Sequence, residues 1–153
     1  MSKRLQIKSI LNDDYVGKTI IVYGWVKTFR SNRFINLNDG SCLSDLQCVV
    51  NYEKLEESKL SKINTGACLK VEGKIVKSQG RGQNVELIVN SLDILGESDP
   101  ENFPIQPKKH SFEFLRENAH LRVRTKTLSS VFRIRSEVSY AIHDFFNKNN
   151  FYY

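Results

Sequence analysis

Residues 19–28 (TIIVYGWVKT) combine a high content of β-branched and aromatic side chains with a single glycine, Gly24, in their middle. This composition predicts a long strand, and a glycine inside a strand usually marks a bulge or a sharp bend. A strand that bends can take part in two sheets at once, as the first strand of a small, partly open barrel must. We therefore expect a mainly β chain built around a barrel.

Four further strand signals follow, separated by turn signals and by one helix signal. Apolar and polar residues alternate in the last two of them, as in strands with one buried face. The predicted strands cover residues 19–28, 34–37, 43–50, 67–77 and 85–95, a tight Asp-Gly turn covers 38–41, a helix covers 52–63, and residues 5–18 form a lead-in. Three strands, a helix and two strands are the order of an OB-fold, a five-stranded Greek-key barrel. An SH3-like barrel would leave the helix unexplained.

The loops that flank the binding face of such a barrel carry positive charge. In an OB-fold this face lies on the second and third strands, between the loops after the first and fourth strands, which here are residues 29–33 and 78–84. Residues 24–34 hold three cations and no acid, and the second loop contains Arg81 between two glycines. The formal net charge of the chain is +6. A basic groove of this kind attracts nucleic acid, while a solvated basic loop can have the same composition.

Phe34 and Gln47 supply the chemistry for recognising an unpaired base. An aromatic ring stacks on a base, and a side-chain amide pairs with a base edge. Both residues lie on the strands that form the binding face of the predicted barrel. The alternatives are that Phe34 belongs to the barrel core and that Gln47 is an ordinary exposed strand residue.

The composition changes after the barrel. All three prolines lie in residues 97–109, which predicts an extended linker, and a short helix is expected over 112–117. Residues 127–149 repeat apolar side chains at three- and four-residue steps, the pattern of an amphipathic helix. Candidate caps are Thr127 or Ser129 at its start and Asn149 or Asn150 at its end.

These signals predict three regions. They are a barrel domain over 1–98, a linker over 99–125 and, over 126–153, the truncated start of a second domain. The amphipathic helix and the strand-like end at 151–153 are too short to bury their apolar side chains by themselves, so we expect them to open a larger domain.

Several function classes are excluded by composition. The three cysteines are odd in number and form no CxxC pair, which argues against a disulfide framework and a zinc site. The three histidines are scattered, and none receives a catalytic or metal-binding role. No apolar run approaches the roughly 20 residues that cross a bilayer, and the N-terminus carries no export signal. We expect a cytoplasmic protein that does not associate with membranes.

Several motifs together resemble the N-terminal anticodon-binding domain of class IIb aminoacyl-tRNA synthetases, which comprise the aspartyl, asparaginyl and lysyl enzymes. The motifs are GWV at 24–26, FINLNDGS at 34–41 and LQCVV at 46–50. The segment LNDGSC at 37–42 is similar to the asparaginyl enzymes in particular. Residues 120–135 resemble the entry into motif 1, the dimer-interface helix of the class.

The resemblance implies roles for individual residues. Phe34 would stack on the middle base of the anticodon, a uracil, and Gln47 would read that uracil, since an amide can donate to O4 and accept from N3–H. Arg30 would lie near the anticodon backbone, and Ser78 and Glu86 would contact neighbouring bases. The implied dimer-interface residues are Val131, Ile134, Val138 and Phe145. Alternatively, Glu86 could form an ion pair with Lys70 or Lys74 across the strands.

The resemblance also implies a parent enzyme, a ligase that activates asparagine with ATP and Mg²⁺ and attaches it to its tRNA. Motifs 2 and 3, which grip ATP in the family, are absent from these 153 residues. We therefore expect the fragment to bind the anticodon loop without a cofactor and to be inactive alone. The alternatives are a free-standing OB-fold protein for single-stranded nucleic acid, an aspartyl or lysyl synthetase fragment, and an interaction protein that binds no RNA.

Overall fold

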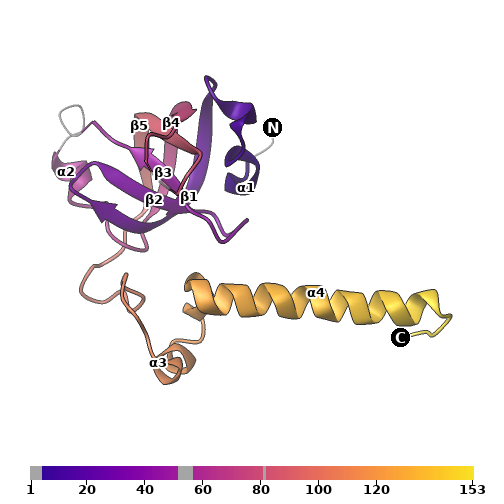
Figure 1. The fold of residues 1–153 in the computed structure, drawn as a ribbon. Coiled ribbons are helices and arrows are strands. Elements are labelled where there is room, and N and C mark those ends of the chain that lie inside the picture. The colour runs from indigo at the N-terminus through magenta and orange to yellow at the C-terminus, as the bar shows by residue number, and fades with distance from the viewer. Residues whose placement is uncertain (1–4, 52–56, 81) are drawn as a thin grey trace. The chain divides into compact units, whose positions relative to one another are not determined.

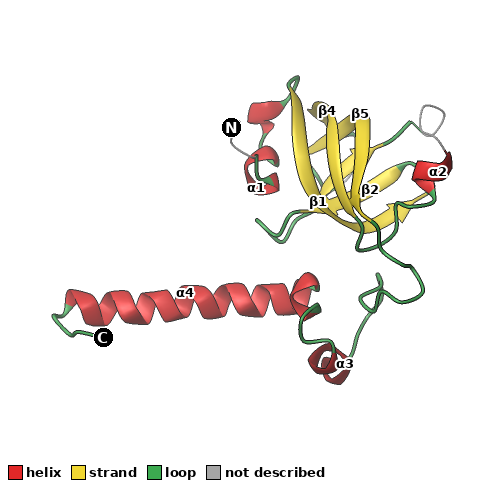
Figure 2. Ribbon diagram, turned by 180° about the vertical axis from the view of Figure 1, so that it is seen from behind, coloured by secondary structure: helices red, strands yellow, loops and turns green. Residues whose placement is uncertain are grey.

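The computed structural model describes residues 5–51, 57–80 and 82–153, which divide into two compact units, Met1–Lys108 and Lys109–Tyr153. All the strands lie in the first unit, and the second is helical (Figures 1 and 2). Within the described ranges, no helix is both long and apolar enough to cross a membrane.

The first unit is a closed five-stranded barrel with the strand order β1-β2-β3-β5-β4. The strands are β1 (Thr19–Arg30), β2 (Phe34–Asn38), β3 (Leu46–Val49), β4 (Cys68–Lys77) and β5 (Val85–Gly96). β3 and β5 are parallel, and the other neighbours are antiparallel. The prediction of a mainly β, five-stranded barrel followed by a helix is confirmed.

β1 pairs with two neighbours and changes partner at Trp25. It pairs with β4 from Thr19 to Trp25 and with β2 from Trp25 to Arg30. The predicted irregularity lies after Gly24, because the register with β2 shifts between Val26 and Thr28. Gly24 has another role: a Cβ there would lie 2.9 Å from the carbonyl oxygen of Asn38, so the close approach of β2 requires glycine.

Gly73 lies opposite a bulge in β5, where Asn90 has no partner on β4. The register with β5 shifts between Glu72 and Gly73, and a Cβ on Gly73 would lie only 2.1 Å from the Ile88 carbonyl oxygen. The glycine that interrupts the fourth strand in the sequence therefore lets β5 approach at the bulge.

The turn between β2 and β3 is wider than the predicted Asp-Gly turn, and β3 begins at Leu46 rather than Leu43. Asn38, only 9% exposed, organises this turn: its Nδ2 donates to the Ser44 carbonyl oxygen at 3.1 Å and to Asp45 Oδ1 at 2.9 Å. Its Oδ1 accepts from the Gly40 amide at 2.8 Å. These bonds fix the residues between β2 and β3 in a turn, so β3 begins only at Leu46.

The lead-in contains a short helix, α1 (Ile7–Ile10), and a 3₁₀ turn, η1 (Asp13–Tyr15), neither of which the sequence predicted. Ile7 and Ile10 are fully buried in the barrel core. The Ile7 amide donates to Asp39 Oδ2 at 3.0 Å, which attaches α1 to the β2–β3 turn. The remaining core members are Ile20, Val22, Val26, Ile35, Leu37, Leu46, Cys48, Val50, Ile63, Ala67, Leu69, Val71, Ile75, Val85, Leu87 and Leu92.

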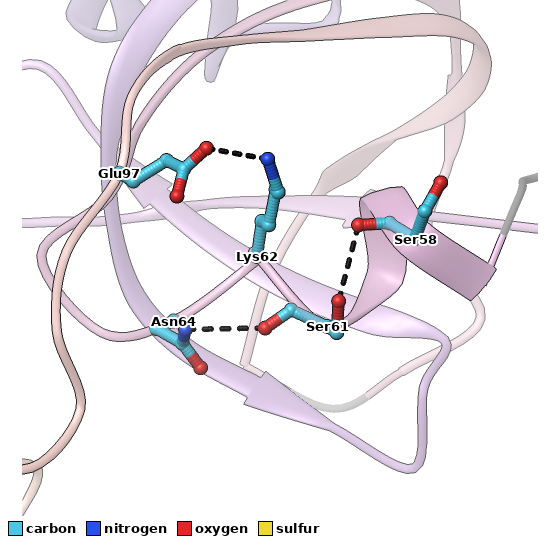
Figure 3. Close-up of polar contacts among 5 residues, drawn as sticks. All are labelled: Ser58, Ser61, Lys62, Asn64 and Glu97. Carbon is cyan, nitrogen blue, oxygen red and sulfur yellow. Dashed lines mark hydrogen bonds and ion pairs between the residues drawn. The ribbon is translucent and has the colours of Figure 1, made fainter.

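A helix lies between β3 and β4, as predicted, over α2 (Glu57–Leu60). Residues 52–56, the first part of the predicted helix, lie outside the described residues. Polar contacts hold the segment that follows α2 (Figure 3): Ser61 Oγ donates to the Ser58 carbonyl oxygen at 3.1 Å, and Asn64 Nδ2 to that of Ser61 at 3.2 Å. Lys62 Nζ lies 2.7 Å from Glu97 Oε1, which joins this segment to the residue after β5.

The first residues of the predicted linker form a turn on the barrel. The Phe103 amide donates to the Asp99 carbonyl oxygen at 2.9 Å, the Phe103 ring lies over Gly66, and Ile105 is only 8% exposed. Hydrogen bonds from the Asn102 side chain and the Glu101 amide lower the pKa of Asp99. This part of the proline-rich segment is therefore fixed by side-chain contacts.

The second unit contains α3 (Phe112–Glu117), a 3₁₀ turn η3 (Arg122–Arg124) and the long α4 (Lys126–Lys148). α3 matches its predicted bounds. α4 is capped by Thr125, whose Oγ1 accepts from the Leu128 amide at 3.4 Å, so the predicted caps Thr127 and Ser129 are wrong. Its last turn ends at Asn149 as predicted.

Candidate nucleic-acid interface

Two rows of outward side chains cross the barrel wall formed by β1, β2, β3 and β5. Strand pairing aligns Arg30, Phe34, Val49 and Ile88 in the first row. It aligns Thr28, Asn36 and Gln47 in the second row. Paired residues point to the same side of a sheet, so Phe34 and Gln47 share one face of the wall.

This face is the outer one. Ile35, Leu37 and Cys48, which alternate with these residues along β2 and β3, are fully buried. Phe34 and Gln47 are half-buried, so the alternative that places Phe34 in the barrel core is wrong. The wall therefore offers an aromatic ring and a carboxamide on adjacent strands.

A tight turn places Arg33 over the Phe34 ring and leaves Arg30 opposite Phe34 on β1. Ser31 and Asn32 have φ values of 54° and 49°, and the Arg33 amide donates to the Arg30 carbonyl oxygen at 3.0 Å. Three residues, 31–33, connect the paired residues Arg30 and Phe34, and positive φ values at two of them tighten this turn. The Arg33 guanidinium lies over the Phe34 ring, 5.5 Å from its centroid, within the range of a cation–π contact. Arg30 is exposed at the end of β1.

The Glu86 carboxylate gathers three side chains at the start of β5. Its Oε2 accepts from Gln47 Nε2 at 3.2 Å, from Ser78 Oγ at 3.3 Å and from Gln83 Nε2 at 3.4 Å. We call Gln47, Ser78, Gln83 and Glu86 the carboxylate cluster. It joins β3, the end of β4 and β5 on the outer wall, and it brings together three of the predicted RNA-binding residues.

The alternative partners of Glu86 have other neighbours. Lys70 pairs with Asp93 at 3.0 Å, and the hydrogen bond and charge of Asp93 raise the pKa of Lys70. Lys74 is aligned with Ile88. The alternative in which Glu86 forms an ion pair with Lys70 is therefore wrong, because the register places Asp93 opposite that lysine.

The Ser78 hydroxyl is fully used within the protein. It donates to Glu86, and it accepts from the Gly80 amide at 3.0 Å and from Gln83 Nε2 at 2.9 Å. A hydroxyl has one donor and two acceptor positions, so contact between Ser78 and a base requires the loss of one of these bonds. Ser78 organises the β4–β5 loop.

Sequence reasoning missed Gln83 and gave Arg33 no role beyond its charge. Gln83 precedes Glu86 by three residues in a loop noted only for charge and glycine, and no local pattern marks it. Arg81, the cation that made this loop basic, lies outside the described residues. The residues expected at a dimer interface belong to the second unit, on α4, with exposures of 51% for Val131, 64% for Ile134, 51% for Val138 and 62% for Phe145.

Among the residues that the structure describes, no three histidine, cysteine, aspartate or glutamate side chains lie together in a group that could hold a metal ion. The side chains on the wall offer stacking, hydrogen bonding and charge.

Comparison with known proteins identifies the barrel as one of a nucleic-acid-binding kind. Residues 20–95 match the tRNA anti-codon family, described as an OB-fold nucleic acid binding domain. The chain is 44% identical to the asparagine–tRNA ligase of Cytophaga hutchinsonii over 99% of its own length and 34% of that protein. It is 47% identical to the enzyme of Parabacteroides distasonis, over 99% of this chain and 33% of that one.

Solved structures have the same fold. Asparaginyl-tRNA synthetase of Pyrococcus horikoshii, complexed with asparaginyl-adenylate, superposes with a TM-score of 0.83 at 22% identity, over 99% of this chain and 36% of that chain. The Entamoeba histolytica enzyme, also complexed with asparaginyl-adenylate, gives 0.75 at 26% identity, over 88% and 34%. The chain spans about a third of the length of the curated relatives it matches. Through the barrel of residues 20–95, the chain belongs to the tRNA anti-codon family of OB-fold nucleic acid binding domains, and it is a relative of the asparagine–tRNA ligases.

Proposed function

We propose that this chain binds the anticodon loop of a tRNA on the outer wall of its barrel and provides the tRNA-recognition part of an asparagine–tRNA ligase. The observation that carries the proposal is the common outer face of Phe34 and Gln47 on adjacent strands, in a barrel of the anticodon-binding family. An unpaired base held against this wall meets a stacking surface and a hydrogen-bonding amide together.

Each residue has a part in the proposed complex. Phe34 stacks on the middle anticodon base, and Gln47 pairs with that base as a uracil, donating to O4 and accepting from N3–H. Arg30 and Arg33 attract the phosphates on either side, so binding weakens as salt rises. Arg33, which covers the Phe34 ring in the free protein, moves aside or stacks on the incoming base. Glu86 lies on the same wall and accepts a hydrogen bond from Gln47, and Ser78 fixes the β4–β5 loop next to Glu86.

The enzymatic part of the proposal concerns the whole ligase. There, asparagine would be activated with ATP and Mg²⁺ and esterified to the tRNA, in the cytoplasm, by a homodimer. The asparaginyl-adenylate in the two solved structures is consistent with that chemistry in relatives. Within this chain, α4 would contribute Val131, Ile134, Val138 and Phe145 to the contact with a second copy.

The proposal is tested by measuring the affinity of the chain for an anticodon stem-loop with a central uracil. Phe34→Ala should weaken binding by about 1–3 kcal/mol, the usual worth of base stacking. Gln47→Met, which keeps the length of the side chain and removes the amide, should weaken binding to the uracil loop and reduce its advantage over a cytosine loop. Gln47→Glu is less suitable, because it would set a second carboxylate against Glu86.

Phe145→Ala is the matched control, since it removes the same side chain from α4 and should leave RNA affinity unchanged. If Phe34→Ala binds the stem-loop as tightly as the unsubstituted chain, the base does not stack on the wall and the proposal is wrong. Equal affinity of the unsubstituted chain for the stem-loop and for unstructured oligonucleotides would indicate a sequence-indifferent single-strand binder instead.

A further inference from the structure

We propose that Glu86 is a positioning residue that fixes the orientation of the Gln47 carboxamide and thereby makes the wall selective for uracil over cytosine. The inference rests on the proposed function, in which Gln47 reads the middle base. It assigns Glu86 an action through Gln47 rather than a contact of its own with that base.

The orientation of Gln47 follows from the chemistry of its partner. A carboxylate can only accept hydrogen bonds, whereas a carboxamide has an NH₂ end that donates and a carbonyl end that accepts. Gln47 Nε2 lies 3.2 Å from Glu86 Oε2. If the amide rotated by half a turn, its Oε1 would face Oε2 at a similar distance, and two acceptors would repel each other. Glu86 therefore favours one of the two orientations.

The favoured orientation leaves a defined pair of groups for a base. With one N–H donated to Glu86, Gln47 retains its second N–H as a donor and Oε1 as an acceptor. Uracil offers an acceptor at O4 beside a donor at N3–H, and the two patterns are complementary. Cytosine offers a donor at N4 beside an acceptor at N3, so it requires the amide in the other orientation, which Glu86 opposes.

The carboxylate is itself held in place. Ser78 Oγ and Gln83 Nε2 donate to the same oxygen that receives Gln47, at 3.3 Å and 3.4 Å. Gln83 Nε2 also donates to Ser78 Oγ at 2.9 Å, which closes a ring of bonds within the carboxylate cluster. These two donors hold Oε2 next to Gln47. Glu86 therefore does not rotate away, and the Gln47 amide keeps its preferred orientation.

The test compares the full 153-residue chain with its Glu86→Met variant, titrated with two anticodon stem-loops that differ only by uracil or cytosine at the middle position. We expect the unsubstituted chain to prefer uracil by roughly tenfold or more, the usual worth of a two-bond base contact. Methionine has a side chain of similar length without a strong acceptor, so the variant tolerates either orientation of Gln47. Glutamine would be unsuitable, because its carbonyl oxygen could accept from Gln47, Ser78 and Gln83 as Oε2 does. The ratio should fall to within about threefold, mainly because cytosine binds more tightly.

A gain in affinity for the cytosine loop is the decisive result, since a residue with a purely structural role would lower the affinity for both loops. Glu72→Met, on the half-buried β4 position Glu72 outside the cluster, is the control and should leave the ratio unchanged. An unchanged ratio in Glu86→Met, with or without a common loss of affinity, contradicts the positioning role. An unsubstituted chain without any uracil preference contradicts the proposed function itself, because then Gln47 does not read the base.

Discussion

Apolar side chains of the barrel and of α4 lie in opposite environments. The barrel buries a core of its own, in which Ile35, Leu37 and Leu69 have no exposed surface. In α4, every residue of which the structure describes, no side chain is buried, and Ile134 is 64% exposed. The barrel is thus stabilised by contacts within its own unit. α4 depends on local features such as its Thr125 cap and the Asp144–Lys148 pair.

This difference separates two kinds of surface. On the barrel, the outer wall is mostly polar and ordered by hydrogen bonds, as a surface that reads a ligand must be. On α4, an apolar stripe is exposed, and a continuous stripe of this kind marks an interaction with another protein surface. The barrel can therefore be tested as a folded object without its helix, whereas the role of α4 can be tested only through association.

The largest expected effect is the difference in thiol reactivity between the buried Cys48 and the other two cysteines. All three cysteines lie in the barrel unit, and burial raises the pKa of Cys48 from 9.0 to about 12, whereas Cys42 and Cys68 are half-buried. At pH 8, a disulfide reagent should label Cys48 at least about a thousandfold more slowly than the other two, because its thiolate is rare and inaccessible. Removal of residues 109–153 should not change this protection. Fast labelling in the shortened chain would mean that the helical unit holds the barrel closed.

The same shift sets the direction of a pH effect. The folded state keeps the Cys48 thiol protonated up to about pH 12, while the unfolded chain loses the proton near pH 9.0. The contribution of this group to stability is therefore complete below pH 9 and declines as the pH rises from there toward 12. The midpoint of urea unfolding should fall over that interval, and a Cys48→Ala chain should show a smaller decline.

Matched isoleucine truncations give the next contrast. Ile35→Ala removes a fully buried side chain and should lower the free energy of unfolding by about 2–5 kcal/mol. Ile134→Ala removes an exposed one and should change it by less than about 0.5 kcal/mol. Urea unfolding followed by fluorescence measures the barrel selectively, because Trp25 is the single tryptophan of the chain. Equal losses in the two variants would show that α4 packs against the barrel in solution.

The part of the barrel that could be predicted from the sequence is the part governed by alternation. Phe34 and Gln47 were expected on the binding face because the predicted strand order makes their strands the second and third of an OB-fold. The pairing of β2 with β3 and the alternation along each strand place both on one side of the wall. α4 was predicted for the same kind of reason, since its apolar residues repeat at helical spacing. Local periodicity carries no information on which distant residues meet.

The features that could not be predicted depend on distant contacts. α1 is too short to have a helical period, and it is held by the bond from Ile7 to Asp39, 32 residues away. The Gln47–Glu86 bond joins residues 39 apart. The wide β2–β3 turn depends on the side chain of Asn38, which the sequence shows only as part of a turn signal. Such contacts arise only when the barrel closes.

The last contrast concerns what covers α4. If the apolar stripe packs against a second copy, Val138→Glu should weaken self-association of the chain by roughly tenfold or more, because the carboxylate would be buried without a partner. Ser136→Glu is the control: it adds the same charge two residues away, on the opposite side of the helix. Analytical ultracentrifugation over a range of concentrations measures both. A wild-type chain that stays monomeric, or equal weakening by the two substitutions, contradicts the homodimer, and the exposed stripe then belongs to a contact with another surface.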